Sequence, residues 1–195
     1  MESNKANISV WPFEVDQLET WAYVNSIFTK KECEEIIKIG NKHNMSLATV
    51  SGGNKKVRKS QVSWIYPKHD LNWIYRKVTD AAMYLNNTYF KFNLYGFIEG
   101  FQFTYYKSPG GKYEKHVDRG MRSQIRKLSL TIQLSDPSSY EGGDLHLYTG
   151  NEATIIPKEQ GKLIAFPSYV LHEVTPVTKG ERYSLVAWIT GTQFK

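Results

Sequence analysis

The stretch Lys127-Leu-Ser-Leu-Thr-Ile-Gln-Leu134 alternates between apolar and polar side chains. A period of two predicts a β-strand whose successive side chains point to opposite sides of a sheet. One face would carry Leu128, Leu130, Ile132 and Leu134, and the other Ser129, Thr131 and Gln133. In a jelly roll one of these faces lines the central cavity, so the polar face either borders a cavity or simply meets water.

Seven further short runs of strand type, separated by Gly and Pro, lie on both sides of this stretch. Such a dense series of strands is typical of a sandwich or a jelly roll. The predicted strands are 101–106, 115–118, 144–148, 153–156, 162–166, 172–177 and 182–189.

Two helices are predicted before the strands. Thr29-Lys-Lys-Glu32 has the pattern of a capping box and begins a helix over about 30–42. Apolar residues at helical spacing between Asp70 and Leu85 predict a second helix, with Asp70 as its candidate N-cap and an end near 86–87. The expected fold is therefore α+β: a jelly roll with the N-terminal helices packed on one outer face.

Length and composition favour one globular domain. The chain has 195 residues, of which 41% are hydrophobic and 14% aromatic, and this excludes a disordered chain and a membrane protein as starting points. Its only cysteine, Cys33, excludes an internal disulfide and a thiolate zinc site, which leaves His and carboxylate as metal ligands.

The net charge and the first residues of the chain indicate which partners and which cellular location to expect. The net charge of +6 could attract nucleic acid or an acidic substrate, but the basic residues are spread along the chain, so nucleic acid is not the expected partner. The first residues lack the apolar core of a signal peptide, and no stretch is long and apolar enough to span a bilayer. We expect a cytoplasmic protein without a membrane partner.

Three residues form a candidate metal site. In His116-Val117-Asp118 an imidazole and a carboxylate stand two residues apart, so both project from the same face of an extended segment. His172 follows more than 50 residues later. Two histidines and one carboxylate are the ligand set that leaves open positions on ferrous iron. The alternative for His116 and Asp118 is an ordinary buried hydrogen-bonded pair.

Arg182 lies ten residues after His172. Alternation places Arg182, Ser184, Val186 and Trp188 on one face, and a turn at 178–181 could bring the chain back beside the His172 strand. The arginine and the third ligand would then line one cavity, where a planar guanidinium could bind a carboxylate through two hydrogen bonds. A surface arginine beside a turn is the alternative.

These motifs, in this order, resemble the 2-oxoglutarate oxygenases of the prolyl hydroxylase type. The spacing is Tyr-x9-His-x-Asp, then His-x9-Arg-x-Ser and a Trp, over about 30–191. Glu141-Gly-Gly-Asp144 resembles a Gly-Gly strand of that family, and Val57-Arg-Lys-Ser-Gln-Val-Ser-Trp64 resembles its mobile substrate loop. The chain departs from the animal collagen enzymes, which have a lysine at the position of Arg182, and it is more similar to compact microbial or viral members.

The resemblance implies a double-stranded β-helix in one oxygenase domain over 1–195, with helical support at about 29–90 and a jelly-roll core at about 98–191. It implies Fe(II) on His116, Asp118 and His172, with 2-oxoglutarate, dioxygen and ascorbate as further cofactors. Arg182 would hold 2-oxoglutarate. Its other expected contacts are Tyr106, Thr131, Gln133, Ser184 and Trp188.

The implied reaction is hydroxylation of a peptidyl side chain, with proline expected, and release of succinate and CO2. The partner would be a proline-containing peptide or protein, bound by Arg58 and Trp64 under a loop at about 51–64. The alternatives are an oxygenase acting on nucleic acid and a non-catalytic jelly-roll binding module. His146 in Asp144-Leu-His146 is a second His and carboxylate pair, but no Arg and Trp follow it at the family spacing.

Overall fold

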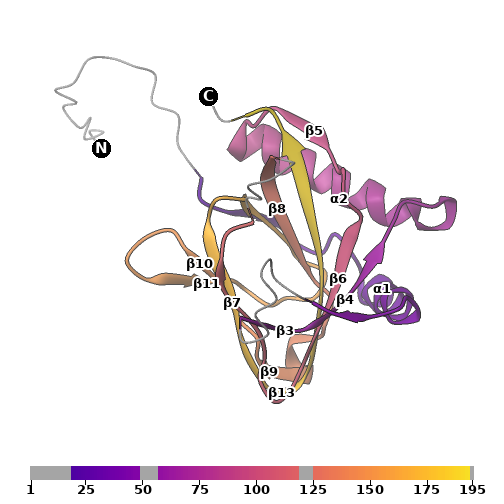
Figure 1. Ribbon diagram of the computed structural model, residues 1–195. Coiled ribbons are helices and arrows are strands. Elements are labelled where there is room, and N and C mark those ends of the chain that lie inside the picture. Colours follow the sequence, from indigo (N-terminus) through magenta and orange to yellow (C-terminus); the bar gives the residue numbers. More distant parts are fainter. Residues whose placement is uncertain (1–18, 49–56, 119–124, 194–195) are drawn as a thin grey trace, which may run out of the picture.

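The computed structural model describes residues 19–48, 57–118 and 125–193 (Figure 1). In this part of the chain the helical elements are α1 (Lys30–Lys42), η1 (His69–Leu71), α2 (Asn72–Leu85), η2 (Asn86–Phe90) and η3 (Pro137–Ser139). None of its helices is long and apolar enough to cross a membrane.

The strands in these ranges form two facing sheets. The first sheet has the order β1 (Ala22–Val24), β12 (Leu163–Pro167), β8 (Arg126–Gln133), β13 (Leu171–Gly191), β6 (Phe101–Lys107), β4 (Gln61–Ile65) and β2 (Ser46–Leu47), with β5 (Leu94–Gly96) beside the end of β13. The second sheet contains β3 (Arg58–Lys59), β7 (Gly111–His116), β9 (Tyr140–Gly142), β10 (Leu145–Tyr148) and β11 (Ala153–Ile155), together with the first half of β13. This arrangement is the predicted jelly roll.

One strand, β13, belongs to both sheets. Its first half pairs with β7 and β10, and its second half pairs with β6 and β8 (Figure 1). The predicted return turn at 178–181 is therefore wrong, because the chain bends from one sheet into the other while remaining paired, with Gly180 at φ 71°. The bend still places His172 and Arg182 on facing walls.

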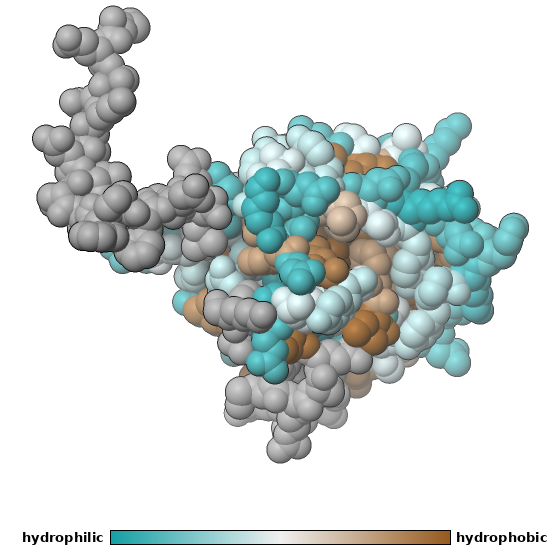
Figure 2. Space-filling view, turned by 90° about the horizontal axis from the view of Figure 1, so that it is seen from above, coloured by the Kyte–Doolittle hydropathy of each residue, from teal (hydrophilic) through white to brown (hydrophobic). Residues whose placement is uncertain are grey.

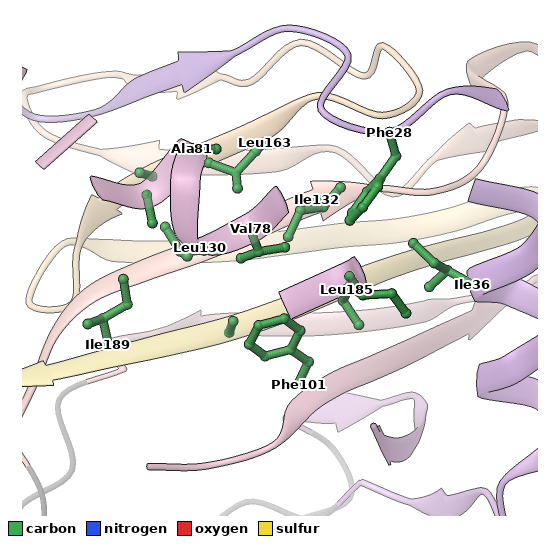
Figure 3. Packing of buried hydrophobic residues seen from close by; sticks show 14 of the residues in the cluster. Phe28, Ile36, Val78, Ala81, Phe101, Leu130, Ile132, Leu163, Leu185 and Ile189 are labelled. Atoms are coloured by element: carbon green, nitrogen blue, oxygen red, sulfur yellow. The ribbon is translucent and has the colours of Figure 1, made fainter. Parts of the chain in front are cut away.

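The helices pack against the outer face of the first sheet. Cys33 and Ile36 of α1 and Ile74 and Val78 of α2 join one buried cluster with apolar residues of β8, β12 and β13. Figure 3 shows this packing, with Leu130, Ile132, Leu163 and Leu185 from the sheet. Because the apolar face of β8 is covered by helices, its polar face is turned to the space between the sheets.

The helix ends differ in how well the sequence predicted them. Thr29 and Glu32 form the predicted capping box at the start of α1. Asp70 is not the N-cap of α2, because it lies in η1 and the cap residue is Leu71, which makes no side-chain cap hydrogen bond. Beyond Leu85 the chain continues through the π-turn η2 until Lys91, whose φ of 56° ends the helical path.

The segment 51–64 was predicted as a loop. Residues 51–56 lie outside the described residues, but Arg58–Lys59 and Gln61–Ile65 are strands paired with β7 and β6. The loop prediction is therefore wrong for the part that the structure describes. Backbone pairing with partner strands, rather than any pattern within these short segments, makes them extended.

Candidate functional site

A cavity of about 410 Å³, including its opening, lies between the two sheets. Nine of the eleven predicted site residues line it, and they come from both sheets. The lining residues are Arg58, Gln102, Tyr106, Tyr113, His116, Asp118, Thr131, Leu145, His172, Val174, Arg182, Ser184, Val186 and Trp188.

The candidate metal ligands meet in this cavity. One nitrogen of each histidine and one oxygen of Asp118 all lie within 4.8 Å of one another. His116 Nε2 is 3.7 Å from Asp118 Oδ1, and His172 Nε2 is 3.5 Å from Asp118 Oδ2. Backbone pairing sets this geometry, because His116 and His172 are direct partners in the ladder between β7 and β13.

Each of the two histidines uses one ring nitrogen in a hydrogen bond and has the other available to bind a metal ion. His116 Nδ1 is 2.7 Å from the carbonyl oxygen of Glu114, and His172 Nδ1 is 2.9 Å from that of Val170. A carbonyl oxygen only accepts, so each Nδ1 carries the proton and each Nε2 presents its lone pair. Both lone pairs are directed toward Asp118, as in histidines that ligate a metal through Nε2.

Burial and charge keep the site in its ligating protonation state. Burial, together with the neighbouring His172, lowers the pKa of His116 to about 4. For Asp118 burial by itself would favour the acid, but the interactions with His172 and His116 outweigh it and lower the pKa of this carboxyl. At neutral pH a neutral imidazole therefore faces an ionised carboxylate.

Further contacts fix the carboxylate of Asp118. Ser129 Oγ donates a hydrogen bond of 2.8 Å to Asp118 Oδ2, and the backbone N–H of Asp118 donates to the carbonyl of Ser168. The Trp188 indole is close enough to help lower the pKa of Asp118, although its Nε1 makes no hydrogen bond of ordinary geometry. Arg126 lies 3.8 Å over the Trp188 ring and donates to the Asp118 carbonyl.

The donor set fits a divalent metal ion such as Fe(II). Two neutral imidazole nitrogens and one carboxylate are the ligands of non-haem iron, and three ligands leave coordination positions for other molecules. The Nε2 atoms of His172 and His116 lie 3.5 and 3.7 Å from the carboxylate, beyond normal hydrogen-bond length. A metal ion between them would satisfy all three groups.

Arg182 is a fully buried cation with neutral partners. It is 1% exposed, Nη2 donates to Gln133 Oε1 at 3.0 Å, and Nη1 donates to Ser184 Oγ at 3.4 Å. Its Nε has no partner, and its Cζ lies 5.2 Å from the centre of the Tyr106 ring. Among the described residues no carboxylate oxygen lies within 4 Å of its nitrogens. A buried charge of this kind requires an anion, which the cavity can admit.

The Gly-Gly motif borders this arginine. Gly143 has a φ of 61°, and a Cβ there would lie 2.9 Å from Arg182 Cδ and 2.9 Å from Val177 Cγ2. Gly142 has a φ of 71°, and a Cβ would lie 2.2 Å from the carbonyl oxygen of Pro176. Gly143 therefore allows the chain to pass close to Arg182, and Gly142 allows it to pass close to the backbone of Pro176.

The two predicted substrate residues differ in position. Arg58 lines the cavity, whereas Trp64 does not and instead packs against Trp188 at 6.2 Å between ring centres. Gln133 also lies behind the cavity wall, where it accepts from Arg182. Apart from Trp64 and Gln133, all the predicted site residues line the cavity.

The second His and carboxylate pair lies elsewhere. His146 faces Glu173 at 3.5 Å, and Asp144 pairs with Lys158 at 2.7 Å. Sequence reasoning missed Gln102, Tyr113 and Ser129 as parts of the site. Gln102 alternates with Thr104 and Tyr106 along β6, and this period could have identified it.

Part of the chain is similar to known proteins. Residues 101–190 match the family model of the 2OG-Fe(II) oxygenase superfamily. A PKHD-type hydroxylase of Teredinibacter turnerae is 42% identical over 86 residues, which are 41% of this chain and 38% of that protein. The chain thus matches less than two fifths of the length of this curated relative.

The fold has solved counterparts. A prolyl-4-hydroxylase of Pseudomonas putida superposes with a TM-score of 0.71 at 21% identity, covering 89% of this chain and 94% of that one. A prolyl hydroxylase of Trichoplax adhaerens, in complex with a peptide fragment of hypoxia inducible factor, gives 0.74 at 18% identity, covering 88% and 84%. These similarities establish the double-stranded β-helix.

Proposed function

We propose that this chain, whose residues 101–190 match the 2OG-Fe(II) oxygenase superfamily, is an Fe(II)- and 2-oxoglutarate-dependent dioxygenase that hydroxylates a peptidyl side chain. Proline is the expected target, with succinate and CO2 as the other products. The observation that carries the proposal is one cavity holding both a histidine–carboxylate trio and a buried arginine without an acidic partner among the described residues. The helical support at 29–90 and the core at 98–191 act as one domain in this proposal.

His116, Asp118 and His172 hold the metal. When bound, iron and 2-oxoglutarate supply the oxidising chemistry, for which no side chain of the protein is suited. The protein contributes ligand geometry: the Nδ1 hydrogen bonds fix the two imidazoles, and Ser129 fixes the carboxylate. Such outer contacts set both metal affinity and ligand orientation.

Arg182 binds the carboxylate of 2-oxoglutarate that lies farther from the metal. Its guanidinium is oriented in advance by Gln133 and Ser184, so little side-chain entropy is lost on binding. Tyr106, Thr131 and Trp188 line the cavity around it and restrict the ligand to one orientation. Burial strengthens the ion pair because water is excluded from around it.

The peptide enters at the opening, beside Arg58, while Trp64 supports Trp188. The peptide seen with the Trichoplax adhaerens protein supports an acceptor of this class. The acceptor is a side chain of a peptide or protein, and the strand Arg58–Lys59, which pairs with β7 alone among the described strands, offers it a fixed edge.

The test is a panel of proline-containing peptides and small acceptors, incubated with Fe(II) and 2-oxoglutarate and analysed by mass spectrometry. We expect at least one proline peptide to gain one oxygen atom, with one succinate released for each hydroxylation. His172→Ala should abolish both products, whereas His69→Ala, at an exposed histidine, should retain them. Oxygen gain only on non-proline acceptors would refute the proline assignment, and product formation by His172→Ala would refute the metal site.

A further inference from the structure

Two arginines line the cavity, and all their described partners are neutral. Arg182 binds Gln133 and Ser184. Arg58 Nε donates to Ser60 Oγ at 2.8 Å, and its Nη2 donates to Gln102 Oε1 at 2.9 Å. Two buried or half-buried cations in one cavity call for two anionic groups.

Three carboxylates on or beside the strands around the cavity are already paired with other groups. Glu114 pairs with Lys112, Glu99 binds Arg126, and Asp118 faces the two histidines. Within residues 19–48, 57–118 and 125–193, no carboxylate oxygen lies within 4 Å of an Arg58 nitrogen. The sequences of segments 49–56 and 119–124 contain no Asp or Glu, so neither can supply one.

The guanidinium of Arg58 is held in place. Its Cζ lies 4.3 Å from the centre of the Tyr113 ring, and the two hydrogen bonds to Ser60 and Gln102 use only two of its five N–H groups. The planar group is therefore ordered before any ligand arrives and retains donors for one. This is how an arginine is prepared for a flat, two-oxygen acceptor.

Arg58 is also close to the reacting centre. The Tyr113 ring that it covers stacks on His116 with 3.5 Å between ring centres. One aromatic ring thus lies between the guanidinium and a metal ligand. An anionic group bound to Arg58 would therefore lie close to the metal ligands, and on a peptide it would be near the residue that is oxidised.

From these observations we propose that Arg58 binds a carboxylate of the substrate, and that the enzyme selects acceptors with an acid next to the hydroxylated residue. This inference rests on the proposed function and refines its substrate class. A neutral peptide carbonyl could accept the hydrogen bonds but would leave the charge of Arg58 uncompensated. The acid can come from an adjacent Asp or Glu side chain or from the α-carboxylate of a terminal residue, since both present the same planar group.

The experiment compares matched peptides. One pair carries Asp or Asn beside the target proline, and a second pair ends in a free carboxylate or an amide directly after it. Binding is measured by fluorescence anisotropy of labelled peptides with Mn(II) and 2-oxoglutarate, and turnover by mass gain with Fe(II). We expect the acidic member of at least one pair to be favoured about tenfold in both Kd and kcat/KM, as for hydrogen bonds to a charged group. The pair that shows the preference identifies the source of the acid.

Variants test whether Arg58 causes the preference. Arg58→Gln should reduce the ratio of acidic to neutral peptide to about one, and Arg58→Lys should retain part of it. Lys59→Gln is the matched control, because it removes the same charge from the next residue, whose Nζ binds the Pro109 carbonyl. It should keep the full preference.

The outcomes separate this inference from the proposed function. Hydroxylation without a charge preference in wild type, or a preference that survives in Arg58→Gln, would overturn the inference and leave the function intact. Preferential binding of acidic peptides without any oxygen gain would refute the function and leave the anion site standing. If Arg58→Gln fails to fold, the preference of the wild type for acidic over neutral peptide is measured at increasing salt. An ion pair weakens as salt is raised, so a preference that does not fall with salt would overturn the inference.

Discussion

Arg182→Met is the most informative single change in the cavity. It removes the buried guanidinium but keeps a flexible apolar side chain of similar length in its place. In the wild type the group binds only Gln133 and Ser184 among the described residues and is 1% exposed. Removing one member of a desolvated charge pair costs about 2–5 kcal/mol, so 2-oxoglutarate affinity should fall by about 30-fold to 4,000-fold.

The same change should leave the stability of the ligand-free protein nearly unaltered. Two hydrogen bonds of about 1 kcal/mol each are lost. In compensation, a buried charge without an anion is removed, and replacing such charges by apolar groups is often neutral or stabilising. We expect the free energy of unfolding without ligand to change by no more than about 1 kcal/mol.

Thermal unfolding with Mn(II) and increasing 2-oxoglutarate measures both quantities. At 100 times the wild-type Kd, bound ligand adds about 2.7 kcal/mol to stability, whereas a variant weakened 100-fold gains only about 0.4 kcal/mol. Arg76→Met, at an exposed arginine of α2, should behave as the wild type. A variant Arg182→Met that is strongly destabilised without ligand, yet still stabilised normally by 2-oxoglutarate, would show that Arg182 supports the fold and does not bind the ligand.

Three further predictions concern the groups around the two binding centres. Gly143→Ala should weaken 2-oxoglutarate binding by at least tenfold, because the new Cβ would press on Arg182 Cδ at a residue whose φ is 61°. Gly150→Ala is the control, since there is open space around Gly150, and equal affinities of the two variants in a calorimetric titration would contradict the prediction. Ser129→Ala should lower Mn(II) affinity by about 10-fold to 100-fold, since it removes the hydrogen bond that orients Asp118; an unchanged EPR titration would contradict that role. Metal-free protein should lose stability as the pH falls from about 6.5 to 4, because His116 has a lowered pKa in the folded protein and the unfolded chain therefore binds the proton more readily. Denaturant titrations at pH 7 and 5 should show a smaller loss of stability for His116→Gln than for the wild type. An identical loss would show that His116 does not cause the pH dependence.

Local patterns in the sequence predicted the parts of the fold that depend on local chemistry. The capping box at Thr29 and the alternation along 127–134 both correspond to observed structure, although the alternation left open whether the polar face of that strand borders the cavity or meets water. A period of two fixes the faces of a strand whatever its partners are. His116 and Asp118 could be paired for a similar reason, since they stand two residues apart, whereas His172 was joined to them only by its place in the order of the family motifs.

What the sequence did not predict depends on distant partners. The bend of β13 at 178–180 continues pairing with β9, and no local signal separates such a bend from a return turn. The strand Arg58–Lys59 exists because β7 pairs with it. Asp70 carried the pattern of an N-cap, but the turn His69–Leu71 comes first and the helix begins one residue after Leu71. Tertiary contacts override local preference in each case.

The central claim is that one cavity holds the metal and 2-oxoglutarate together. A crystal structure of the protein with Mn(II) and 2-oxoglutarate, with anomalous data collected for manganese, tests it most directly. We predict one anomalous peak bounded by His116 Nε2, Asp118 and His172 Nε2, with the far carboxylate of 2-oxoglutarate on Arg182. A peak beside Asp144 and His146, with none at the trio, would contradict the account.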